Sequence, residues 1–114
     1  MIQIFGTKKC RETQKVLRFF KERNIEVQFR DIDVKPPSPG ELDDMAGALG
    51  GPRELLDPEG PAAKKRGLSF MDYDAREELL LHPDLYRTPL VRPGKGRALL
   101  GFDEKALKDL VKSI

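Results

Sequence analysis

Cys10 is the only cysteine in the sequence, and it lies where a short apolar segment gives way to a helical pattern. A thiol at the first turn of a helix faces unpaired backbone N–H groups and the positive end of the helix dipole, which favour the thiolate over the thiol. Lys8, Lys9 and Arg11 add positive charge beside it. Although a lone cysteine is more often a small buried apolar residue, this position predicts a reactive nucleophile.

The composition limits the other kinds of site that the chain can build. One cysteine forms neither an internal disulfide nor a cysteine-based zinc site, and one histidine provides no histidine cluster. The 21 basic and 19 acidic residues are interspersed, so the net charge of +2 predicts no direct binding to nucleic acid or membrane. No apolar run reaches the length of a signal peptide or a membrane span. We therefore expect a cytoplasmic protein with no metal and no bound cofactor.

The N-terminal part of the chain predicts a strand, a helix and a second strand. Residues 1–5 alternate between apolar and polar and end at Gly6, residues 11–23 carry apolar side chains at helical spacing, and residues 26–32 alternate strictly. Asn24 is a natural stop for the helix. A β-α-β unit of this size implies a right-handed crossover and a parallel pair of strands.

The middle of the chain predicts a stiff connector followed by helices. Prolines fill residues 36, 37 and 39, and a helix is expected from Ser38 or Pro39 to about Leu49. Residues 52–82 predict short helical pieces broken by proline and glycine. Their apolar side chains are expected to pack on the sheet: Leu55, Leu56, Leu68, Phe70, Met71, Leu79 and Leu80.

The C-terminal part predicts two short strands and a closing helix. Residues 90–92 and 97–100 form the strands, with a hairpin turn at residues 93–96. Asp103 is expected to cap the helix. The apolar stripe of that helix consists of Ala106, Leu107, Leu110, Val111 and Ile114.

This order of elements, β-α-β, a helical insertion and then β-β-α, is the layout of a thioredoxin-like fold. We therefore predict an α/β protein with a mixed four-stranded sheet, as one domain spanning residues 1–114 with an α-helical insertion at about 39–82. Pro89 stands at the start of a predicted strand, which is ordinary for an edge strand. In thioredoxin-like sheets, however, a cis-proline here packs beside the redox cysteine, and the backbone before it pairs with an extended thiol substrate.

The chain resembles the arsenate reductase and Spx-like family of thioredoxin-fold proteins. The matching segments are residues 5–13, the helix that leads to Asn24 and Ile25, and residues 82–85, 88–91 and 99–103. The resemblance covers nearly the whole length, including the helical insertion. It implies an oxidoreductase with Cys10 as the catalytic thiol, glutathione as co-substrate, and a small thiol or a glutaredoxin- or thioredoxin-type protein as reductant.

The chain also departs from the family at the cysteine motif. Family members often carry C-x-x-C, whose second cysteine closes a disulfide with the first, and here that position is Thr13. Threonine cannot resolve a mixed disulfide, so the resolving thiol must come from outside. The Thr13 hydroxyl either donates a hydrogen bond to the Cys10 thiolate or caps the helix.

Three arginines hold the oxyanion in arsenate reductases of this family, and only one of them matches well. The first position is Asp57 here, which reverses the charge, and the second is Thr88. Arg87 is expected to be a poor substitute, because a shift of one residue in an extended segment turns the side chain to the opposite face. Arg97 matches the third arginine. Because only one of the three arginines matches, this departure from the family pattern favours thiol–disulfide chemistry over arsenate reduction.

From these residues we predict that Cys10 is catalytic. The predicted substrate-binding residues are Arg11, Thr13, Thr88, Pro89 and Arg97. The alternative is an Spx-like regulatory protein that binds RNA polymerase, or a family member without turnover. A Cys10 thiol of ordinary reactivity would favour that alternative.

Overall fold

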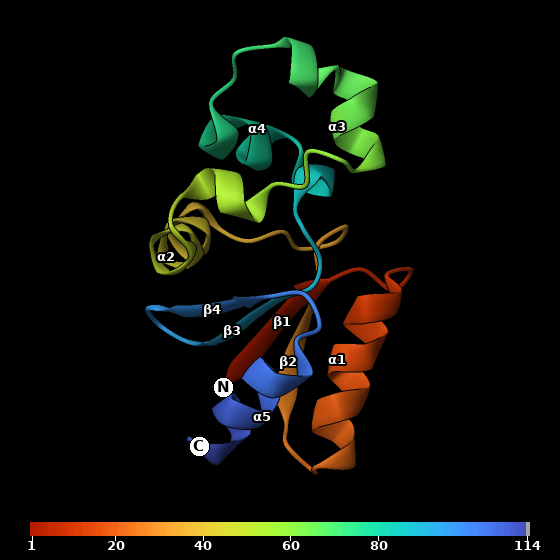
Figure 1. Cartoon of the computed structure of the whole chain (residues 1–114), viewed down its shortest axis with the longest axis vertical. Helices are drawn as coiled ribbons and strands as arrows, with labels where there is room; N and C mark the ends of the chain where they lie inside the picture. The colour runs from red at the N-terminus through yellow and green to blue at the C-terminus, as the bar shows by residue number, and fades with distance from the viewer. Residues whose placement is uncertain (114) are drawn as a thin grey trace.

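A mixed sheet of four strands forms the centre of the computed structural model, which describes residues 1–113 (Figure 1). The strand order is β2-β1-β3-β4. β1 (Ile2–Gly6) runs parallel to β2 (Val27–Asp31) and antiparallel to β3 (Leu90–Gly94), which pairs antiparallel with β4 (Arg97–Leu100). This sheet confirms the predicted fold class, including the parallel pair that the β-α-β start implied.

Two helices cover one face of the sheet, and the long segment between β2 and β3 supplies the helices on the other side (Figure 1). α1 (Arg11–Glu22) connects β1 to β2, and α5 (Glu104–Lys112) follows β4. The segment between β2 and β3 contains six short helices: α2 (Pro39–Leu49), η1 (Pro52–Leu55), α3 (Pro61–Arg66), η2 (Leu68–Phe70), α4 (Ala75–Leu81) and η3 (Pro83–Leu85). Within residues 1–113 no helix is long and apolar enough to cross a bilayer.

The alternation of side chains along β1 and β3 divides the core into two parts. Ile4 and Val91 point toward α1 and α5, where they join Val16, Phe20 and Leu107. Their strand neighbours Phe5 and Leu90 point the other way and pack among buried residues of the inserted helices. Because successive side chains of a strand face opposite sides, both layers depend on the same two central strands.

The turn between β3 and β4 is shorter than the sequence indicated. β3 continues through Pro93 to Gly94, and only Lys95 and Gly96 form the turn, with Gly96 at φ 80°. The β3–β4 register shifts between Val91 and Gly94. Proline has no N–H to donate to the ladder, so a strand accommodates it at such an irregularity rather than ending there.

The prediction that all seven apolar residues of the insertion pack inward was wrong for three of them. Phe70, Met71 and Leu80 are 92%, 46% and 37% exposed, whereas Leu68 and Leu79 are buried. A helix of one or two turns has only one side against the core, so its adjacent apolar residues cannot all be covered. In α5, Asp103 caps the helix by accepting from the Ala106 N–H at 3.1 Å, as predicted, and Ile114 lies outside the described residues.

A buried ion pair attaches α2 to the edge of the sheet. Arg30 of β2 is 8% exposed and donates from both terminal nitrogens to the carboxylate of Glu41, at 2.9 and 3.1 Å. Glu41 also accepts from the Ser38 N–H at 2.9 Å, completing a capping box at the start of α2. Partial burial raises the pKa of Glu41, but the hydrogen bonds from Arg30 and Ser38 outweigh it and bring the pKa to about 2.

Glu41 is therefore expected to make the stability of the protein depend on acid. Its pKa is lower in the folded than in the unfolded state, so its contribution is complete above about pH 5 and disappears as the pH falls toward 2. Because solvent screens part of the pair, we expect Glu41→Gln to lower the free energy of unfolding by about 1–2 kcal/mol at pH 7. Urea unfolding between pH 7 and 2 should show this difference shrinking to zero. The exposed Glu104, paired with Lys108, is the control, and Glu104→Gln should change little.

Candidate active site around Cys10

The sequence between β1 and α1 places Cys10 at the entrance of the helix. After Gly6 the chain turns at Lys8 and Lys9, and the Cys10 N–H donates to the Thr7 carbonyl at 3.2 Å. Cys10 is the N-cap residue of α1, with φ −77° and ψ 118°, and its side chain does not cap the helix. The first-turn N–H groups of α1 consequently have no side-chain cap and remain available to the sulfur.

Hydrogen bonds make the Cys10 thiolate easier to form than that of an ordinary cysteine. Partial burial raises the pKa of Cys10, but the side chains of Thr13 and Thr88 and the backbone N–H groups of Thr13 and Glu12 together lower it below its ordinary value. Lys8, Lys9 and Arg11 are exposed, and none of them is among the largest causes of this lowering. The sequence therefore predicted the direction of the pKa shift, but it gave too much weight to these three charges.

Thr13 lies beneath the sulfur and is fully buried. Its hydroxyl oxygen has no hydrogen-bond partner within residues 1–113 while Cys10 is a neutral thiol, so it does not cap the helix. A buried hydroxyl without a partner is costly. Ionisation of Cys10 supplies an acceptor next to this hydroxyl, so Thr13 favours the thiolate.

Thr88 and Pro89 face Cys10 from the start of β3. The peptide bond between them is cis, and Pro89 is buried. The thiol of Cys10 donates to the Thr88 carbonyl at a sulfur–oxygen distance of 3.6 Å. The Gly101 N–H donates to the Pro89 carbonyl at 2.8 Å, fixing the segment against the end of β4. The structure therefore brings together Cys10, Thr13, Thr88 and Pro89, four of the residues that the sequence assigned to the site.

Two segments of the chain between β2 and β3, residues 55–57 and 85–87, meet beside this proline. Leu56 and Tyr86 form an isolated antiparallel bridge, the Asp57 N–H donates to the Leu85 carbonyl at 2.9 Å, and the Arg87 N–H donates to the Leu55 carbonyl at 2.7 Å. This backbone clamp holds the segments of Asp57 and Arg87 side by side at the edge of the site, where both residues line the same hollow.

An open hollow of about 400 Å³ lies in front of the sulfur. Cys10 and Thr88 form part of its wall with Leu100 and Gly101, and three charged side chains complete the lining: Glu12, Asp57 and Arg87. The hollow thus carries two carboxylates and one guanidinium. No group of three or more His, Cys, Asp or Glu residues that could hold a metal ion is present in residues 1–113.

Arg87 was wrongly placed on the opposite face by the sequence argument. It lines the hollow together with Thr88, and its half-buried side chain keeps Nε without a hydrogen-bond partner. The alternation rule assumes a regular strand, but β3 begins only at Leu90, and the chain bends at Thr88. The bend explains why adjacent side chains reach the same hollow.

Arg97 and Arg11 do not line the Cys10 hollow. Arg97 is exposed at the first residue of β4, beside the Lys95–Gly96 turn, whereas Leu100 at the other end of β4 lines the hollow. Arg97 and Leu100 are three positions apart on the strand, which places their backbones about 10 Å apart. Arg11 follows Cys10 but is exposed to solvent. The structure therefore does not bring Arg97 to the Cys10 hollow, because this residue lies at the opposite end of β4.

The structure superposes on solved structures over nearly the whole chain. A protein of Bacteroides fragilis described as related to the arsenate reductase family is 24% identical, with a TM-score of 0.80 and coverage of 96% of both chains. An arsenate reductase from Vibrio cholerae is 19% identical, with a TM-score of 0.78 and coverage of 99% of this chain and 97% of the other. The chain has the fold of the arsenate reductase-related proteins. No protein-family model and no curated protein sequence matches it.

A glutaredoxin superposes less well on this chain than the arsenate reductase-related proteins do. A glutaredoxin from Archaeoglobus fulgidus reaches a TM-score of only 0.50, at 19% identity, over 97% of this chain and 85% of its own. The arsenate reductase-related fold is thus the better description of the whole chain.

Proposed function

We propose that this protein is a thiol–disulfide oxidoreductase that uses Cys10 as its single nucleophile. The observation that supports this most directly is the position of the sulfur, at the N-terminus of α1 and 3.6 Å from the Thr88 carbonyl, with a lowered pKa and an open hollow before it. A thiolate that is accessible and stabilised by hydrogen bonds is the reactive form in disulfide exchange.

The reaction has two exchange steps. The Cys10 thiolate attacks one sulfur of a disulfide, the S–S bond breaks, a mixed disulfide with Cys10 forms, and the other half leaves as a thiolate. Because Cys10 is the only cysteine in the chain, an external thiolate then attacks the mixed disulfide and releases reduced Cys10. Glutathione, or a glutaredoxin- or thioredoxin-type protein, is the reductant that we propose. Such a thiol needs a reducing compartment, and we propose the cytoplasm.

The charges around Cys10 support a disulfide rather than arsenate as the electrophile. Glu12 and Asp57 repel a dianionic oxyanion, and Arg87 alone attracts it. Glutathione carries one ammonium and two carboxylates, so Arg87 and Asp57 offer partners of both signs to one molecule. Arsenate reduction, which the resemblance to arsenate reductases suggests, is therefore proposed only as a weak side activity.

The backbone at Thr88 supports binding of an extended thiol substrate. No backbone hydrogen bond involves the Thr88 N–H within residues 1–113, and this residue immediately precedes the buried Pro89. An extended peptide paired with Thr88 would gain main-chain hydrogen bonds in the manner of an added strand. In this proposal, Thr88 and Pro89 bind the substrate backbone while Cys10 reacts with its sulfur.

The proposal predicts that Cys10 reacts rapidly with both an alkylating agent and glutathione disulfide. The iodoacetamide rate, measured as a function of pH, should have its midpoint below that of free cysteine, because hydrogen bonds lower the pKa of the thiol. Mass spectrometry should show one glutathionyl group on the protein, removed by glutaredoxin. Cys10→Ser should show neither reaction.

A separate assay distinguishes the alternatives. Incubation with arsenate and glutathione should give little arsenite above the Cys10→Ser background. A midpoint equal to that of free cysteine, together with no glutathionyl adduct, would reject the oxidoreductase and favour a regulatory binding protein such as one that contacts RNA polymerase.

A further inference from the structure

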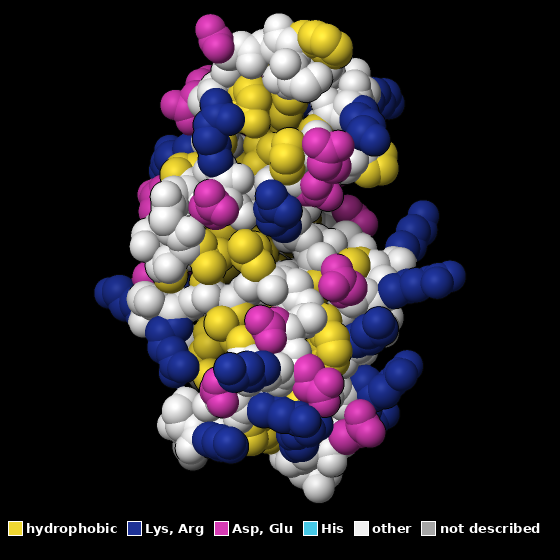
Figure 2. All heavy atoms as spheres, viewed as in Figure 1, with side chains coloured by type: hydrophobic (Ala, Val, Ile, Leu, Met, Phe, Trp, Pro, Cys, Tyr) yellow, Lys and Arg dark blue, Asp and Glu magenta, His cyan; other side chains and the backbone are white. Residues whose placement is uncertain are grey.

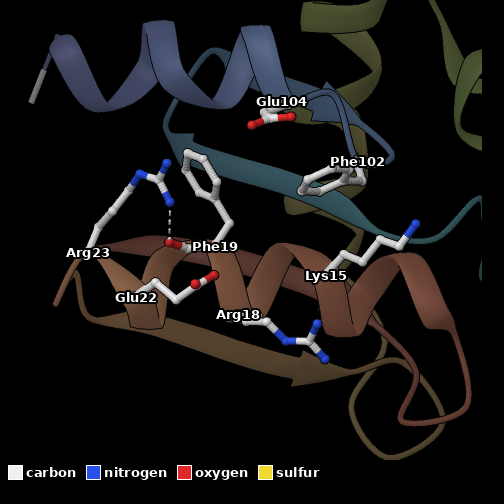
Figure 3. Close-up of a pocket in the computed structure, with 7 residues that line it drawn as sticks. All are labelled: Lys15, Arg18, Phe19, Glu22, Arg23, Phe102 and Glu104. Atoms are coloured by element: carbon white, nitrogen blue, oxygen red, sulfur yellow. Dashed lines mark hydrogen bonds between the residues drawn. The ribbon is translucent and has the colours of Figure 1, made fainter.

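A second hollow, of about 340 Å³, lies between α1 and the segment that joins β4 to α5 (Figure 3). Lys15, Arg18 and Glu22 line it from α1, and Phe102 and Glu104 line it from the opposite wall. Figure 3 shows the Phe19 and Phe102 rings between α1 and the helix that contains Glu104, with Lys15 beside Phe102, whereas Arg18 extends from the outer side of α1. The hollow thus combines an aromatic floor with a charged rim.

The charged groups of this rim differ in whether they are already paired. Arg23 lies 3.7 Å over the Phe19 ring and donates to the Phe19 carbonyl at 3.1 Å, and Glu104 pairs with Lys108 at 3.1 Å. Lys15 Nζ lies 5.9 Å from the centroid of the Phe102 ring, but Lys15 and Arg18, both exposed, form no ion pair within residues 1–113, and neither does Glu22. Two unpaired cations against one unpaired anion favour an acidic group as the occupant.

The surrounding surface reinforces this preference. Residues 8–23 contain seven basic and two acidic residues, a net charge of +5, although the whole chain carries only +2. Residues 39–82 contain ten acidic and five basic residues, a net charge of −5. Figure 2 shows Lys and Arg side chains gathered along the edge where α1 lies. The field of the molecule therefore attracts negative charge to α1 in particular.

The second hollow lies beside the Cys10 hollow along α1. Glu12 and Gly101 line the Cys10 hollow, and the next residues along the same two walls, Lys15 and Phe102, line the second one. Eight helical residues separate Cys10 from Arg18, about 12 Å along α1. An extended chain spans that distance in three to four residues.

We propose that the disulfide attacked by Cys10 is carried on a polypeptide, and that an acidic residue three or four positions from the partner's cysteine lies against Lys15 and Arg18. This inference rests on the proposed function and identifies its substrate as an acidic protein segment. The Cys10 thiolate attacks the sulfur of the partner's cysteine, the partner's disulfide breaks, and its other half leaves as a thiolate.

Chromogenic peptides test this substrate class. Each blocked nonapeptide has one central cysteine joined by a disulfide to thionitrobenzoate, whose release by Cys10 is followed by absorbance. Two peptides carry a pair of glutamates three and four residues before or after the cysteine, and two others carry lysines there. For one placement of the charges, either before or after the cysteine, the glutamate peptide should react about threefold to fivefold faster at low salt than the lysine peptide with the same placement. In 1 M salt this difference should disappear.

Two charge-reversed variants of α1 distinguish direct contact between Arg18 and the peptide's acidic residues from the overall electrostatic attraction of the helix. Arg18→Glu should abolish or reverse the ratio of glutamate to lysine rates. Lys21→Glu changes the net charge equally at an exposed α1 position outside the hollow, and the ratio should fall much less. Equal ratios in the two variants would overturn the proposal.

A small neutral probe distinguishes failure of this inference from failure of the proposed function. If the wild-type protein reduces bis(2-hydroxyethyl) disulfide but reacts equally with all four peptides, the acidic segment is rejected and disulfide exchange stands. If neither the small disulfide nor any peptide reacts, both proposals are rejected.

Discussion

Alanine at position 6 will lower the free energy of unfolding by about 2–3 kcal/mol. Gly6 is buried at the end of β1, and a Cβ there would clash first with Thr13 Oγ1 and would also lie 2.6 Å from Thr13 Cγ2 and 3.0 Å from Thr13 Cβ. Thr13 is short, β-branched and fully buried, so it cannot turn away. The whole first turn of α1 must move instead, which separates Cys10 from Thr88.

Urea unfolding of Gly6→Ala measures this cost, and a second glycine provides the control. Gly47 lies within α2, where an added Cβ would meet nothing within 4 Å, so Gly47→Ala should stabilise by about 0.5–1 kcal/mol. The double variant Gly6→Ala with Thr13→Ala should recover part of the loss, because it removes Cγ2. Equal stability of Gly6→Ala and the wild type would show that α1 tolerates a greater distance from β1.

Valine at position 13 should make Cys10 less reactive without weakening the fold. Valine keeps the shape of threonine but lacks the hydroxyl. In the wild type this hydroxyl favours the thiolate form of Cys10, and it has no hydrogen-bond partner when Cys10 is a neutral thiol. A hydrogen bond to a charged group contributes about 1.5–3 kcal/mol, and we take the lower end for this partly exposed thiolate. The loss of thiolate is partly offset because a more basic thiolate is a stronger nucleophile. We therefore expect alkylation at pH 7 to slow about threefold to fivefold.

The pH profile and the stability of Thr13→Val test the same interaction independently. The midpoint of the alkylation rate should move to higher pH, because a cause of the lowered pKa is gone. The free energy of unfolding at pH 6 should stay equal or rise by up to about 1 kcal/mol, since an unpartnered buried hydroxyl has been removed. Thr13→Ser, which keeps the hydroxyl, should retain most of the rate. An unchanged pH profile in Thr13→Val would exclude the hydroxyl as a source of thiolate stability.

The regular elements of this fold follow from local patterns in the sequence. Alternation in residues 26–32, the stop at Asn24, which has φ 55°, and the cap at Asp103 all predicted elements that the structure contains. Exposure of Phe70 was not predictable, because it depends on which side of a three-residue helix meets the core. Local sequence specifies such a helix but not its rotation against a distant partner.

The site was predictable where it depends on order along the chain and unpredictable where it depends on a bend. Cys10 before a helix and Pro89 before a strand are both visible in the sequence, and the common thioredoxin-like layout brings them together. Arg87 reaches the hollow only because the chain is irregular at Thr88, and Arg97 is excluded by the direction of β4. Neither follows from residue type or spacing. The second hollow also went unpredicted, because α1 and Phe102 are distant in sequence.

The backbone clamp at Leu56 and Tyr86 has a consequence for how this protein can diversify. The chain leaves the clamp at Asp57 and returns to it by Leu85, so the stretch from residue 58 to 84 is an excursion with tethered ends. The entropy of closing such an excursion changes slowly with its length. A replacement of different length that still supplies the buried contacts of Ala63, Leu68, Ala75 and Leu79 would leave Asp57, Arg87 and the thiol in place. The length of residues 58–84 can thus vary more freely than the positions of the two ends that hold the site.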